Sequence, residues 1–275
     1  MFLALMGCAA LGFAQDDITM CHTSPTEKFA MFASDKTFNN QHANPRVYTH
    51  ISQAGGKMIK YATPDGKEAN AYLLTKKGSN NWIFVFQEWW GLNDNIKRQS
   101  ENLYNDLGNV NVIALDMYDG NVASDRETAA RYMQAFKQER GNSIVLGAIA
   151  YAGPNAKIGT VGWCFGGGQS MQASLTAGKQ AVACVIYYGM PENNVERLKG
   201  LNCDVLDIYA TRDQRLNADV AKKFEEDMKA AGKKVTVKAY EADHGFANPS
   251  NPIYNKEAAD DAYKLTIAFF KERII

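Results

Sequence analysis

The sequence predicts an α/β fold: a doubly wound, mostly parallel sheet with helices on both faces. Two observations carry this prediction. Apolar runs of strand length alternate along the chain with segments of helical character, the order produced by repeated strand–helix–strand units. Most of the apolar runs are nearly continuous, as expected for strands that are covered on both faces.

Each expected strand is an apolar run rich in β-branched or aromatic residues. The first two runs, at 57–63 and 69–75, predict a hairpin. The other strands are expected at 81–88, 109–118, 156–164, 182–189, 203–211 and 234–242.

The expected helices fill the intervals between these strands and follow the last one. They lie at 93–108, 124–153, 167–178, 217–232 and 256–274. Residues suited to N-capping stand near three of the expected starts, namely Asp94, Ser124 and Asn217. Glycines suited to C-capping stand near three of the ends, namely Gly108, Gly178 and Gly232.

Composition indicates one globular domain. The chain has 275 residues, of which 46% are hydrophobic and 22% charged, enough for one substantial core. Its 30 basic and 30 acidic residues give no net charge. A neutral chain has no long-range field that would attract a phosphate backbone, so nucleic acid is not an expected partner.

The first fourteen residues are apolar and uncharged, and they are too short to span a bilayer. They predict a signal peptide at 1–14, cleaved after Ala14, and hence a periplasmic or secreted protein without a transmembrane span. Lipid anchoring at Cys8 and a cytoplasmic location are the alternatives. Residues 15–56 are polar and aperiodic and predict an irregular leader with little chemistry, ahead of a catalytic domain at 57–275.

The stretch from Gly162 to Gly166 fits a nucleophile elbow, the sharp turn between a strand and a helix, with Cys164 as the nucleophile. The flanking glycines would let strand and helix approach closely around a strained residue. A helix N-terminus favours the thiolate, and the amides of Phe165 and Trp89 would form an oxyanion hole. The alternative is that Cys164 is a buried apolar side chain at a strand end.

Histidine positions favour the catalytic interpretation. His22, His42 and His50 lie in the leader, so His244, after the last strand, is the only histidine in the expected domain. It is the candidate general base. Asp213, in the loop after the preceding strand, is preferred over Asp207 as the carboxylate that orients the base.

Two further features concern the thiol and metals. Glu88 closes a strand and precedes an apolar segment that would desolvate it, so it could hold or exchange the thiol proton. No pair among the cysteines after position 14 has zinc-site or redox spacing, so no metal is expected, and pairing of Cys184 with Cys203 stays open.

The chain resembles the dienelactone hydrolase family of the α/β-hydrolase fold from about Ala54 to the C-terminus. The segments that carry the resemblance are QEWWGLND, ALDMY, GTVGWCFGG, YYG, ATRDQ and ADHGF. It implies a cofactor-free hydrolase of enol lactones and related esters with Cys164, His244 and Asp213 as its triad. It also implies that Glu88 interacts with the thiol and takes part in thiolate formation.

Two departures from the family bear on the substrate. Asp119 and Asn248 occupy places where the family has arginines that grip a substrate carboxylate. An uncharged small ester or lactone is therefore expected. The aromatic residues at the expected site mouth either contact substrate or cap the core; they include Trp90, Tyr118, Trp163 and Phe246. The alternatives are a thioesterase or peptidase on the same fold, or a non-enzymatic small-molecule binder.

Overall fold

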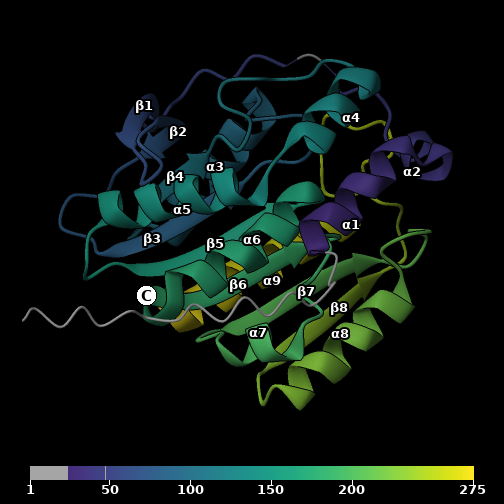
Figure 1. The fold of residues 1–275 in the computed structure, drawn as a ribbon. Helices are drawn as coiled ribbons and strands as arrows, with labels where there is room; N and C mark the ends of the chain where they lie inside the picture. The colour runs from purple at the N-terminus through teal and green to yellow at the C-terminus, as the bar shows by residue number, and fades with distance from the viewer. Residues whose placement is uncertain (1–23, 47) are drawn as a thin grey trace, which may run out of the picture.

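The computed structural model describes residues 24–46 and 48–275. Its eight-stranded sheet has the order β1-β2-β4-β3-β5-β6-β7-β8 (Figure 1). β1 and β2 form the predicted antiparallel hairpin, β2 is antiparallel to β4, and the other neighbours are parallel. The strands are β1 (Lys57–Ala62), β2 (Glu68–Leu74), β3 (Asn81–Phe86), β4 (Asn111–Leu115), β5 (Lys157–Trp163), β6 (Ala181–Tyr187), β7 (Asp204–Ala210) and β8 (Val235–Tyr240). The mostly parallel sheet and all eight expected strands are confirmed.

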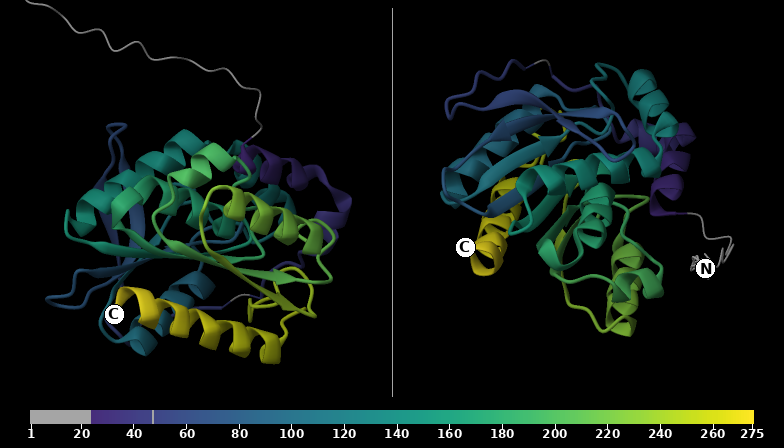
Figure 2. Two further views of the ribbon diagram at one scale, coloured as in Figure 1. Left: turned by 90° about the horizontal axis from the view of Figure 1, so that it is seen from below. Right: turned by 60° about the vertical axis from the view of Figure 1, so that its left-hand side comes forward.

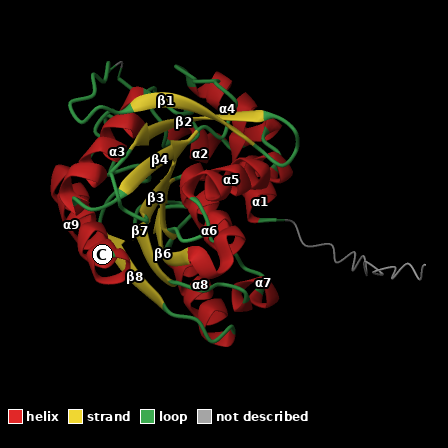
Figure 3. Ribbon diagram, turned by 90° about the vertical axis from the view of Figure 1, so that its left-hand side faces the viewer, coloured by secondary structure: helices red, strands yellow, loops and turns green. Residues whose placement is uncertain are grey.

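Helices cover both faces of the sheet, as predicted (Figure 3). One face carries α3 (Asp94–Leu107) and α9 (Lys256–Ile274), which pack on each other. The other face carries α5 (Gln138–Ala152), α6 (Phe165–Ala177) and α8 (Ala218–Ala230). β3 and β5 are buried almost throughout because this double layer covers them.

The helix expected at 124–153 is two helices, α4 (Arg126–Ala135) and α5, with Phe136 and Lys137 in extended backbone between them. A short helix, α7 (Val195–Lys199), was not predicted. Two expected N-caps are wrong by one residue, because Asn93 and Asp125 make the capping hydrogen bonds in place of Asp94 and Ser124. Asn217 caps α8 as predicted.

The leader is not irregular throughout. It contains α1 (Pro25–Met31), a single 3₁₀ turn η1 (Phe32–Ser34) and α2 (Lys36–Asn40). Ser24 and Glu27 form a reciprocal capping box at the start of α1, and Asp35 accepts from the first amides of α2. We call residues 24–46 the cap, because α1 and η1 pack on α4 and α6 beside the sheet (Figures 1 and 2).

Several expectations fall outside the described residues, among them the signal peptide at 1–14, its Cys8 and His22. In the described part of the chain, Cys164, Cys184 and Cys203 are free thiols. No helix between residues 24 and 275, leaving aside residue 47, has the length and hydropathy needed to cross a membrane.

Candidate active site

Cys164 stands at the junction of β5 and α6 with φ 58° and ψ −120°. A non-glycine residue rarely adopts this backbone conformation, which stores strain at the turn. A Cβ atom on Gly162 would collide with the carbonyl oxygen of Gly166, and one on Gly166 would collide with that of Phe86. The two glycines therefore allow strand and helix to meet as the elbow prediction required.

The loops after β7 and β8 bring Asp213 and His244 together. Nδ1 of His244 lies 2.5 Å from Oδ2 of Asp213. The other carboxylate oxygen of Asp213 accepts from the amides of Arg215 and Leu216, at 2.8 and 3.0 Å. These bonds fix the carboxylate and leave Nε2 of His244 directed away from it. Asp207, the alternative that the sequence left, is buried within β7.

The electrostatics of this group follow from burial and from the ion pair. Burial opposes charge on His244, but the nearby Asp213 and Cys164 overcome that effect and raise the pKa of the imidazole. Burial likewise opposes ionisation of Asp213, and the charge of His244 reverses it, so the pKa of this carboxyl is lowered. Burial raises the pKa of the Cys164 thiol, so the resting sulfur keeps its proton.

Glu88 lies buried two residues after β3, and burial raises its pKa to about 7. Oε2 of Glu88 accepts a hydrogen bond of 2.5 Å from Nδ2 of Asn248. Among the described residues no hydrogen bond joins Glu88 to Cys164. Asn248 therefore meets the glutamate at a place where the family has an arginine for the substrate.

The hydrogen-bond partner of the sulfur is His42, a residue of the cap, whose Nε2 lies 3.6 Å from Sγ of Cys164. Nδ1 of His42 donates to the backbone oxygen of Phe38 at 2.7 Å. Burial and the neighbouring His244 hold the pKa of His42 well below its usual value, so the ring is neutral. A residue of the leader, where little chemistry was expected, therefore contacts the candidate nucleophile. The sequence signal that the leader offers is the Ser24–Glu27 capping box. It predicts a helix but does not predict that the leader contacts Cys164.

Aromatic side chains enclose the three reactive groups. The ring of His42 lies 4.2 Å from that of Phe38 and 4.5 Å from that of Trp89, between centroids. The ring of Tyr188 lies 5.0 Å from that of His244. Cys164 and His244 are each only 1% exposed. The site is therefore closed, and the cap supplies part of the cover.

The four candidate substrate residues take different positions. Trp90 packs on Trp89 with ring centroids 5.0 Å apart, and Tyr118 packs on Phe165 at 5.4 Å. Phe246 lies behind Tyr188, with centroids 5.5 Å apart. Tyr118 also lines a cavity of about 250 Å³, together with Phe136 and Arg140.

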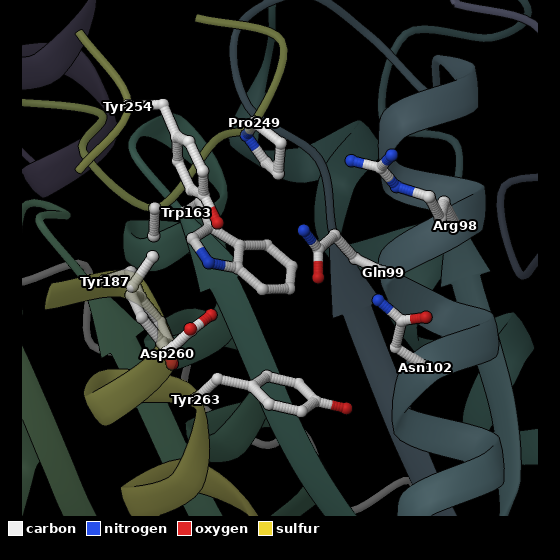
Figure 4. A pocket seen from close by; sticks show the side chains of 11 residues that line it. Arg98, Gln99, Asn102, Trp163, Tyr187, Pro249, Tyr254, Asp260 and Tyr263 are labelled. Atoms are coloured by element: carbon white, nitrogen blue, oxygen red, sulfur yellow. The ribbon is translucent and has the colours of Figure 1, made fainter. Parts of the chain in front are cut away.

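Trp163 faces away from the reactive groups. It lines a cavity of about 150 Å³ between α3 and α9, together with Gln99, Asn102 and Tyr263 (Figure 4). Neither Cys164 nor His244 lines this cavity. Its position therefore favours a packing role for Trp163 over contact with an acyl group bound to Cys164.

The eight-stranded, mostly parallel sheet, the strained elbow after β5, and the acid and histidine after β7 and β8 define an α/β-hydrolase. The sequence from residue 69 to residue 274 matches the dienelactone hydrolase family. That match covers more than half of the chain, so this protein belongs to the dienelactone hydrolase family. It is accordingly a hydrolase of lactone or ester substrates.

Individual relatives agree with this assignment. Protein usf of Aquifex pyrophilus is 28% identical over 231 residues, which cover 79% of this chain and 98% of the relative. A carboxymethylenebutenolidase of a Pseudomonas species is 26% identical over 159 residues, 56% of this chain and 66% of that protein.

Solved structures share the fold. A dienelactone hydrolase-like promiscuous phosphotriesterase from metagenomic libraries has a TM-score of 0.68 at 20% identity, covering 79% of this chain and 98% of its own. A dienelactone hydrolase from Anabaena variabilis has a TM-score of 0.61 at 13% identity, covering 82% of this chain and all of its own.

Proposed function

We propose that this protein hydrolyses small uncharged esters or lactones through an acyl-enzyme on Cys164, with His244 as general base and Asp213 as the carboxylate that orients it. The observation that carries the proposal is the convergence of the three side chains. The sulfur stands on a strained elbow, a ring nitrogen of His244 lies within 4.8 Å of it, and Asp213 holds the opposite ring nitrogen.

In the first half of the proposed reaction, the thiol proton passes to Nε2 of His244 and the sulfur attacks the carbonyl carbon. The amides of Phe165 and Trp89 hold the oxyanion. When the tetrahedral intermediate collapses, the imidazolium gives its proton to the departing alkoxide. The products of this half are an alcohol and a thioester on Cys164; a lactone keeps its alcohol on the bound acyl chain.

In the second half, His244 removes a proton from water, which attacks the thioester. The thiolate leaves and recovers a proton from the imidazolium, and the carboxylic acid is released. Asp213 stays ionised throughout and stabilises the imidazolium in both halves. Because Cys164 is buried, this cycle requires the cover over the sulfur to move before substrate can enter.

The proposed preference for an uncharged substrate rests on the ion pairs and hydrogen bonds made at positions 119 and 248. Asp119 is paired with Arg140 at 2.5 Å, and Arg140 also contacts Asp65 at 3.0 Å. Asn248 donates to Glu88. The two positions that differ from the family therefore offer no free cation for a substrate carboxylate.

The test uses the protein starting at Gln15 and its Cys164→Ala variant. Turnover of p-nitrophenyl acetate should fall by at least about 1,000-fold in the variant, because the nucleophile is lost. Its melting temperature should stay close to that of the wild type. Cys203→Ser, which changes a thiol outside the site, is the matched control and should retain turnover.

Full turnover by Cys164→Ala would overturn the proposal. Substrate class is tested by comparing neutral acyl esters with a hemisuccinate ester, acyl thioesters and aminoacyl anilides. The neutral esters should give the highest kcat/KM. A higher value for thioesters or anilides would replace the ester assignment with a thioesterase or peptidase.

A further inference from the structure

Three side chains with metal-binding atoms converge in the closed site: His42 from the cap, Cys164 from the elbow and His244 from the loop after β8. One ligand atom of each lies within 4.8 Å of the others. All three residues are buried, with at most 4% of their surface exposed. Imidazole nitrogen and thiolate sulfur are the ligands that Zn²⁺ prefers in proteins.

Both histidines are already oriented as metal ligands. Nδ1 of His42 donates to the backbone oxygen of Phe38 at 2.7 Å, and Nδ1 of His244 donates to Asp213 at 2.5 Å. Nε2 of each ring is therefore the atom available to a metal ion. A carbonyl or carboxylate on the far nitrogen is the usual support for a zinc-bound histidine.

The hydrogen bonds at the sulfur leave one of these nitrogens without a partner. A thiol has one proton, and its contact is with Nε2 of His42 at 3.6 Å. Nε2 of His244, which is buried, makes no hydrogen bond to any residue of the described chain. A buried polar atom without a partner is uncommon in proteins. A cation bound to the sulfur and both nitrogens would satisfy all three atoms.

The distances agree with a small tetrahedral ion. With Zn–N near 2.0–2.1 Å and Zn–S near 2.3 Å, a nitrogen and a sulfur on one zinc lie about 3.6 Å apart. The separation between Nε2 of His42 and Sγ has this value. The remaining separations are at most 4.8 Å, so each would have to shorten by no more than about 1.5 Å.

We propose that His42, Cys164 and His244 bind one Zn²⁺ ion, with water in the fourth position. Binding replaces the thiol proton, which is released to solvent, with a sulfur–zinc bond. The bound ion ties the cap to the catalytic domain. If the proposed function is right, the same ion occupies both the nucleophile and the base and stops hydrolysis reversibly.

The test is calorimetric titration of chelator-treated protein with zinc chloride. Wild-type protein should bind one ion per chain and release at least one proton, read from the dependence of the enthalpy on buffer. Affinity should fall at least about tenfold in His42→Gln and in Cys164→Ala. His50→Gln and Cys203→Ser are matched controls outside the site and should bind as wild type does. Magnesium, which prefers oxygen ligands, should not bind.

Cobalt substitution gives a reading that does not depend on activity. Wild-type protein with Co²⁺ should show a thiolate-to-cobalt charge-transfer band that Cys164→Ala lacks. Zinc affinity unchanged in His42→Gln, or lost in Cys203→Ser, would overturn the metal site. If zinc does not bind while Cys164→Ala is inactive on esters, the metal site fails and the hydrolase mechanism stands. If zinc binds but the wild-type protein does not turn over esters, the metal site stands and the hydrolase mechanism fails.

Discussion

Nε2 of His42 lies 3.6 Å from Sγ of Cys164, although 122 positions separate the two residues in the chain. The contact joins the cap to the catalytic elbow and makes the environment of the sulfur depend on a segment outside the α/β domain. Cap docking and thiol chemistry should therefore change together. The first prediction uses this dependence.

Phe38→Ala should loosen the cap. The Phe38 ring is 1% exposed and packs on Trp89 at 5.4 Å and on His244 at 5.7 Å, between centroids. Removal of a buried phenylalanine costs about 3–5 kcal/mol, and here the loss falls mainly on cap docking. The measurement is the rate at which iodoacetamide alkylates Cys164, which should rise. Met31→Ala, an exposed change in the same cap, should leave it unaltered; equal rates in both variants would show that the cap does not protect the sulfur.

Asp213→Asn should abolish most of the activity without unfolding the protein. An amide can donate to Nδ1 and so favours the wrong tautomer of His244, and it cannot stabilise the imidazolium. A loss in kcat of about 10³–10⁴-fold is expected, with a smaller change in KM. Asp243→Asn alters a half-exposed carboxylate in the same loop as His244 and should keep kcat near that of the wild type. Similar kcat values in the two variants would remove Asp213 from the mechanism.

Gly166→Ala should destabilise the protein even though alanine is the better helix former. The helix preference is worth about 1 kcal/mol. The added Cβ, however, would collide with the carbonyl oxygens of Phe86 and Gln87, which belong to backbone and cannot rotate away. Gly141→Ala in α5 is the comparison, because the added Cβ there meets only the side chains of Phe136 and Met117. Urea unfolding should show the larger loss for Gly166→Ala, and the reverse order would contradict the backbone argument.

Asp207 predicts a pH dependence of stability. Burial, with a smaller contribution from Glu225, raises its pKa from 3.8 to about 7. The folded state therefore keeps a proton that the unfolded state releases, so this residue lowers the free energy of unfolding progressively between pH 4 and 7. Asp207→Asn should give little gain near pH 4 and a gain of up to a few kcal/mol at pH 8. Glu226→Gln on the exposed side of α8 is the control; a gain independent of pH in Asp207→Asn would contradict the assignment.

The strands were predictable because their apolar runs are continuous and well separated. The elbow was predictable because the close approach of strand and helix requires glycine at positions 162 and 166. The glycines on either side of Cys164 therefore indicate the turn directly. The choice of Asp213 over Asp207 followed from position alone, since a residue in a loop after a strand can reach the site edge and a residue within the strand points into a covered face.

The contribution of the cap was not predictable by the same reasoning. α1 and α2 have seven and five residues, too few for a helical period to be recognised. The packing of α1 and η1 is set by tertiary contacts with α4 and α6, which local sequence does not encode. The division of α4 from α5 was missed for a related reason, because Phe136 and Lys137 are neither glycine nor proline.

The position of the cap at the start of the chain has a consequence for biosynthesis. Residues 24–46 leave the ribosome before any strand of the sheet, yet the surface they cover includes His244 and the elbow, which are made late. The cap can therefore complete its contacts with His244 only after that part of the chain has been made. Until then the sulfur of Cys164 lacks the part of its cover that the cap supplies, and it is more accessible to oxidants and alkylating agents.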